Sequence, residues 1–92
     1  MFAVTRLRVP DEAAIPAFLT AAGELLTALR ERPGFVRGEL GRSADDPLLF
    51  ALCTTWDGVG AYRRGLSAAE VKIAGAPVWV HALDEPGVYL TE

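Results

Sequence analysis

The segment 48–56 constrains the fold of this chain more than any other. It reads LLFALCTTW and carries no charge. Its residues predict a strand, and because successive side chains of a strand point to opposite faces, this strand is apolar on both. Such a strand needs cover on both sides. The helices of the chain can cover one face. The simplest cover for the other is a second subunit, so we expect a homodimer.

The length of the chain leads to the same expectation. It has 92 residues, of which 51% are hydrophobic. This length suits one domain, spanning 1–92, with one thin core of two layers. A domain of this size cannot easily hide so much apolar surface by itself, which again favours a partner chain. The length also excludes a large cleft between domains and a dinucleotide-binding fold.

Charge and cysteine content exclude further classes of protein. The formal net charge is −3, and only Arg63 and Arg64 form a basic pair, so we expect no nucleic-acid binding. A single cysteine, Cys53, cannot form an intrachain disulfide, and its apolar surroundings predict a buried side chain. We expect no metal site, because no Cys or His cluster has ligand spacing. No signal peptide and no run of about 20 apolar residues is visible, so we expect a cytoplasmic protein that does not bind membranes.

The remaining pattern predicts the order β-α-β-β-α-β. The expected elements are a strand at 2–9, a helix within 11–32, strands at 35–42 and 48–56, a short helix at 58–65, a helix at 68–76 and a strand at 88–91. Segment 78–83 fits a kinked helical turn or a strand, and we favour the helical turn. This order is that of the ferredoxin-like fold, an α+β class in which helices cover one face of an antiparallel sheet.

Helix boundaries follow from capping signals. Asp11 is a natural N-cap, and Asp57 is the expected N-cap of the short helix. Ser67 and Glu70 match a capping box for the helix that follows, and Pro77 is expected to break or kink that helix. The apolar stripe of the first helix is expected to comprise Ile15, Phe18, Leu19, Ala22, Leu25, Leu26 and Leu29.

Several short strings, in this order, resemble the antibiotic biosynthesis monooxygenase family of dimeric α/β-barrel proteins. They are Arg32-Pro33-Gly34-Phe35, the loop from Ser43 to Pro47, Thr55-Trp56-Asp57 and Ala61-Tyr62. The resemblance implies that two sheets pack face to face into a closed barrel. It also implies a small pocket in each subunit, between its sheet and its helices.

The resemblance also implies a choice of activities. The family includes cofactor-independent oxygenases that oxidise anthrone-like aromatic polyketides with O₂, in which a tryptophan and a tyrosine at the positions of Trp56 and Tyr62 line the pocket. A pocket asparagine of that type is replaced here by Leu52, which cannot hydrogen-bond a phenol. Histidine, common in other members near the end of the short helix, is replaced by Gly65.

Haem degradation is disfavoured by the same comparison. Family members with that activity use an asparagine on the first strand and a histidine in the second long helix. Those positions correspond to Thr5 and to Ala74 or Gly75, so neither residue type is retained.

Three residues are candidates for catalysis. Trp56 either stacks on a flat aromatic ligand or plugs the end of its strand. Tyr62 either donates a hydrogen bond to a phenol or carbonyl oxygen or is a core contact. His81, the single histidine, is a general base if it faces the pocket and otherwise a structural or surface residue. The expected substrate-binding residues are Thr5, Phe50, Leu52 and Thr54.

We therefore expect a cofactor-independent oxygenase of a small, flat, aromatic substrate, with no bound metal or organic cofactor. Two alternatives remain open. One is a non-catalytic dimeric module that binds a hydrophobic small molecule or a partner enzyme, and the other is a polyketide cyclase or isomerase that uses the same pocket. Arg6, Arg8 and Arg37 are expected to line the rim of the barrel or to pair across the dimer with Glu39.

Overall fold

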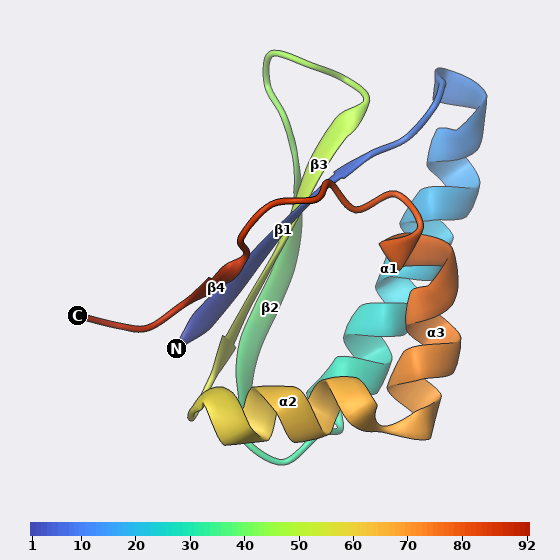
Figure 1. The fold of residues 1–92 in the computed structure, drawn as a ribbon. Coiled ribbons are helices and arrows are strands. Elements are labelled where there is room, and N and C mark those ends of the chain that lie inside the picture. Colours follow the sequence, from blue (N-terminus) through green and yellow to red (C-terminus); the bar gives the residue numbers. More distant parts are fainter.

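The sheet and the helices form two layers. The computed structural model describes residues 1–92. Its elements are β1 (Phe2–Arg8), a 3₁₀ turn η1 (Glu12–Ala14), α1 (Ile15–Arg30), β2 (Phe35–Arg42), β3 (Leu49–Trp56), α2 (Val59–Ser67), α3 (Ala69–Trp79) and β4 (Val88–Tyr89). The antiparallel sheet has the order β2-β3-β1-β4, and Figure 1 shows α1 and α3 on one side of it and α2 across its lower end. The ferredoxin-like α+β fold is thereby confirmed.

Strand β3 occupies an inner position and alternates in burial along its whole length. The side chains that face the helices are buried, and those on the other face are only half-buried. The buried set is Phe50, Leu52, Thr54 and Trp56. The chain therefore covers one face of its apolar strand and leaves the other uncovered.

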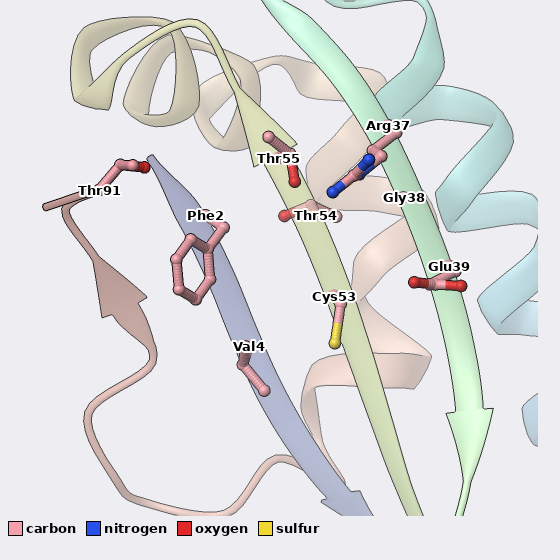
Figure 2. A pocket seen from close by; sticks show the side chains of 9 residues that line it. All are labelled: Phe2, Val4, Arg37, Gly38, Glu39, Cys53, Thr54, Thr55 and Thr91. Atoms are coloured by element: carbon pink, nitrogen blue, oxygen red, sulfur yellow. The ribbon is translucent and has the colours of Figure 1, made fainter.

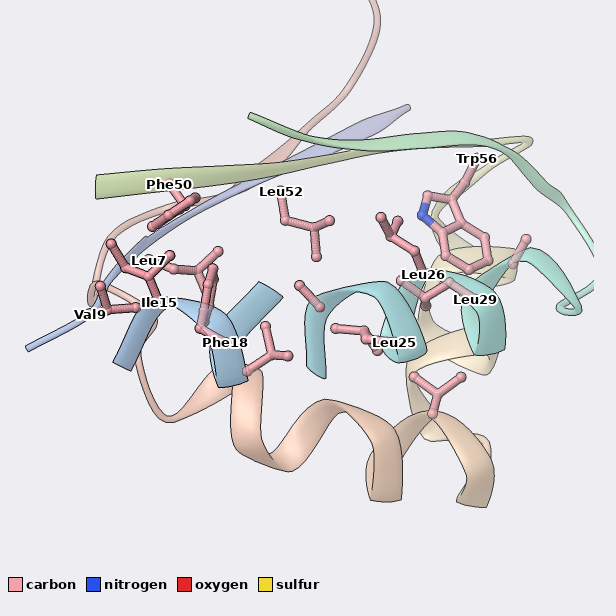
Figure 3. Close-up of a cluster of buried hydrophobic side chains, with 14 residues drawn as sticks. Leu7, Val9, Ile15, Phe18, Leu25, Leu26, Leu29, Phe50, Leu52 and Trp56 are labelled. Carbon is pink, nitrogen blue, oxygen red and sulfur yellow. The ribbon is translucent and has the colours of Figure 1, made fainter. Parts of the chain in front are cut away.

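Helix α1 supplies most of the cover. Its buried residues, Ile15, Phe18, Ala22, Leu25, Leu26 and Leu29, belong to the hydrophobic core, and Figure 3 shows α1 between the sheet and α3. The predicted stripe is correct except for Leu19, which is 45% exposed because it lies at the margin of the stripe. The stretch Glu12–Arg30 is long and apolar enough to span a membrane, but core helices of soluble proteins share this property, and its stripe here packs into the core.

Two of the predicted helix starts are wrong. Asp11 does accept a hydrogen bond from the Ala14 backbone, at 3.0 Å, and so caps η1. Helix α2, however, has Gly58 as its N-cap instead of Asp57. The capping box of Ser67 and Glu70 does not form, because α2 extends through Ser67, whose hydroxyl donates to the Arg63 carbonyl at 2.8 Å.

The start and the end of α3 also differ from the prediction. Glu70 forms an ion pair with Arg32 at 3.0 Å, and the N-cap of α3 is Ala68. Pro77 does not end α3, which continues to Trp79 because the proline lies in its last turn. Segment 78–83 is therefore helical only at its start.

Helix α2 packs on the sheet through a glycine. A Cβ atom built on Gly65 would lie 2.6 Å from Cη2 and 2.7 Å from Cζ3 of the Trp56 indole. Distances this short are incompatible with a side chain. Gly65 thus forms a notch that receives the edge of the indole. In contrast, Gly23 of α1 has open space around its Cβ position.

These two helical glycines give a matched test of the packing. Gly65→Ala should lower the free energy of unfolding by about 1–3 kcal/mol, because the methyl group overpacks the notch. Gly23→Ala should raise it by about 0.5–1 kcal/mol, because alanine favours the helix and meets nothing there. Urea unfolding at one protein concentration measures both. Equal effects of the two substitutions on the free energy of unfolding would contradict the close packing of Trp56 on Gly65.

Candidate functional site

Trp56 ends β3 and points into the layer of helices. Its side chain is only 2% exposed, and its Nε1–H donates to the Thr54 hydroxyl at 3.0 Å. The rings of Phe35 and Tyr62 stand edge-on to the indole, with centroid distances of 5.2 Å and 5.9 Å. The indole is therefore held on several sides. In this arrangement it offers a ligand neither a free N–H nor an exposed face for stacking.

Tyr62 lies in α2, beside this indole. It is half-buried, and burial raises the pKa of its phenol because the charged form loses hydration. Its hydroxyl is therefore protonated at neutral pH and can donate a hydrogen bond. Tyr62 and Trp56 are the two predicted catalytic residues that the structure brings together.

His81 lies at the opposite end of the helical layer. Its carbonyl accepts a hydrogen bond from the Arg8 backbone, and its ring stands edge-on to Phe18. The Trp56 backbone instead contacts Met1, before the start of β1. Strand β1 has seven residues, which span about 20 Å. His81 therefore cannot reach a small substrate that is held by Tyr62.

The predicted substrate-binding residues lie on the expected face but are packed. Phe50, Leu52 and Thr54 are all buried, and the first two belong to the hydrophobic core (Figure 3). Thr5 is half-buried and lies opposite Leu52 in the register of β1 and β3. A ligand that contacts Phe50, Leu52 or Thr54 therefore requires the helical layer to move away from these side chains.

A hollow of about 760 Å³ lies on the uncovered face of the sheet. The strand register arranges its side chains in two rows, each of which crosses β1, β3 and β2 (Figure 2). One row is Phe2, Thr55 and Arg37, and the other is Val4, Cys53 and Glu39. The sequence alone does not predict these rows. Strand alternation carries the signal, but only the register shows which residues lie side by side.

The strand arginines differ in their partners. Arg6 forms two hydrogen bonds with Glu85, at 2.7 and 2.9 Å, and this contact lowers the pKa of the Glu85 carboxyl. Arg8 pairs with Asp46 at 2.7 Å and lowers its pKa in the same way. Both arginines thus have an ion-pair partner within their own chain, and in neither case is that partner Glu39.

Arg37 has no such ion pair, and neither has Glu39. These two opposite charges on β2 are exposed and lie on the uncovered face. The structure contains no group of three or more His, Cys, Asp or Glu side chains that could hold a metal ion.

The fold and the aromatic site define a small α+β protein of the ferredoxin-like type, with a tyrosine and a tryptophan where α2 meets the sheet. The chain belongs to the antibiotic biosynthesis monooxygenase family, whose model matches residues 1–74. A comparison with curated protein sequences finds no match.

Several solved structures share the fold. SnoaB from Streptomyces nogalater, a cofactor-independent oxygenase, superposes with a TM-score of 0.84 at 22% identity over 99% of this chain and 91% of SnoaB. A conserved protein from Methanosarcina mazei has a TM-score of 0.77 at 14% identity over 95% of this chain and 84% of its own. A conserved protein of unknown function from Bacteroides thetaiotaomicron has a TM-score of 0.79 at 18% identity, over 89% and 86%. At these identities the likeness concerns the fold.

The ionisation of Tyr62 can be measured directly. In a Tyr89→Phe variant, absorbance at 295 nm reports Tyr62 alone, and its midpoint should lie above the usual value of about 10. Because the folded-state pKa is the higher one, the contribution of Tyr62 to stability is complete below about pH 10 and is lost as the pH rises further. A midpoint at or below 10 would contradict the burial of this phenol.

Proposed function

We propose that this protein is a cofactor-independent oxygenase of a small, flat, electron-rich aromatic substrate such as a phenol or an anthrone. Membership of the family and the likeness of nearly the whole chain to SnoaB support this proposal. The observation that carries it is Tyr62. This residue places a protonated, half-buried hydroxyl beside a fixed indole, where it can donate to a substrate oxygen.

In the proposed reaction the substrate supplies the electrons. Loss of a proton from an anthrone gives an enolate, and the Tyr62 hydroxyl stabilises the developing negative charge on its oxygen. The enolate transfers an electron to O₂, and the two radicals combine into a peroxide at carbon. Loss of water from the peroxide leaves the quinone, so that one O₂ and one CH₂ group yield one C=O group and one H₂O. Because His81 lies at the far end of the layer, the first proton passes to solvent.

Oxygen consumption tests this function. With 1,8-dihydroxyanthrone or a hydroquinone in an oxygen electrode, the protein should consume O₂ faster than autoxidation. Tyr62→Phe should lower kcat/KM by about 10²-fold, the usual effect of losing a donor to an oxyanion. Tyr89→Phe removes the other phenol hydroxyl, which donates a hydrogen bond to the Pro86 carbonyl in its own turn, and is the matched control. Equal rates for the two variants would refute the role of Tyr62, and turnover under argon would indicate a cyclase or isomerase.

A non-catalytic binding module is the second candidate. It is favoured by Leu52, which is apolar at the position of the pocket asparagine, and by Trp56, whose N–H is already bonded to Thr54. In that case aromatic ligands bind and quench tryptophan fluorescence, but no O₂ is consumed.

We also propose that two copies of the chain pack sheet against sheet. The half-buried face of β3 supports this arrangement, as do the two unpaired charges beside it. In a twofold interface, residue i of one subunit meets residue j of the other and the reverse. Arg37 of each subunit can then meet Glu39 of its partner, which neutralises both charges and sets the register of the two sheets.

Charge reversal tests this pairing. Arg37→Glu and Glu39→Arg should each weaken the dimer by at least about tenfold, because like charges then face each other. The double variant restores complementary charges and should recover most of the affinity. Sedimentation equilibrium measures the dissociation constants, and Arg63→Glu on exposed α2 is the control. A monomer at micromolar concentration in the unaltered protein would contradict the dimer.

A further inference from the structure

Thr54 is the one polar residue in the buried set, with 6% of its surface exposed. It faces the helices, between the apolar Leu52 and the Trp56 indole. Its hydroxyl accepts the hydrogen bond from Trp56 Nε1 at 3.0 Å. A buried polar side chain requires a partner, and this one has its partner two residues away on the same face of the same strand.

This hydrogen bond and the notch at Gly65 hold opposite edges of the indole. The N–H edge is bound to Thr54, and the far edge of the six-membered ring, with Cη2 and Cζ3, lies over Gly65. The edge-on contact with Phe35 adds a further restraint. The indole therefore cannot rotate about its bond to Cβ without losing its hydrogen bond or leaving the notch.

The fixed indole determines where the ring of Tyr62 can stand. The two rings are nearly perpendicular, at 79°, with their centroids 5.9 Å apart. A tyrosine ring is rigid, so its position sets the direction of its hydroxyl. We propose that Thr54 is a positioning residue for Tyr62, which it orients through the Trp56 indole. This inference rests on the proposed function of Tyr62, but it concerns a residue that does not itself touch the substrate.

Thr54→Val and Thr54→Ser separate this role from packing. Valine keeps the shape of threonine but removes the acceptor, and serine keeps the acceptor. The variants are made in a Trp79→Phe background, in which tryptophan fluorescence and circular dichroism near 290 nm report Trp56 alone. Thr54→Val should alter both signals and lower kcat for the anthrone by about tenfold, and Thr54→Ser should restore both. Thr27→Val, which removes an exposed hydroxyl on α1, is the control.

A double-mutant cycle with Tyr62→Phe provides the sharper test. If Thr54 acts through Tyr62, Thr54→Val should have little further effect on kcat once the Tyr62 hydroxyl is absent. An equal loss of rate in both backgrounds would overturn the proposal, as would unchanged Trp56 signals in Thr54→Val.

The proposal can also be tested if the protein oxidises no substrate. Oxygenase function would then be refuted, but absorbance at 295 nm still reports Tyr62 in the Tyr89→Phe variant. Thr54→Val should lower the midpoint of that titration, because a Tyr62 ring released from the indole becomes more exposed. An unchanged midpoint would overturn the positioning role independently of any activity.

Discussion

The burial of β3 under α1 is the contact on which the rest of the structure depends. The helix-facing side chains of this strand meet the apolar stripe of α1, and together they make up most of the core. Because β3 pairs with both β1 and β2, it also places both neighbours in the sheet. Any side chain on these strands is then committed to the covered or the uncovered face, since alternation leaves no third choice.

Because each strand residue is committed to one face, the candidate functional residues are separated onto the two faces and the two ends of the sheet. On the covered face, the end of β3 meets α2, and only there do an indole and a phenol come together. His81 lies at the other end, beside Phe18, so the single histidine is separated from the aromatic pair by the length of β1. On the uncovered face, Arg37 and Glu39 form the charged margin of a half-buried surface. The proposed chemistry and the proposed assembly thus fall on opposite sides of one sheet.

Polar groups inside the covered layer are few, and each has a defined environment. The Trp56 N–H donates its hydrogen bond to the Thr54 hydroxyl, so Tyr62 is the donor beside the indole that remains available to a ligand. Arg32 has an ion pair with Glu70, although its buried Nε lacks a partner. So few polar groups suit the proposed reaction, in which the substrate itself supplies the reactivity and the protein contributes orientation and a hydrogen bond.

The sequence by itself determined the order of the elements, most of their bounds and the two-faced character of segment 48–56, because these depend on local periodicity and composition. Its resemblance to a family also assigned Trp56 and Tyr62 to one pocket. Only the tertiary structure decided which polar side chains form ion pairs and hydrogen bonds with one another. Glu70 pairs with Arg32 instead of capping α3, Arg6 and Arg8 find Glu85 and Asp46, and Trp56 gives its N–H to Thr54. Most of these contacts join residues that are far apart in the chain. A local sequence pattern cannot show which of several possible partners lies nearest once the sheet and the helices have packed together.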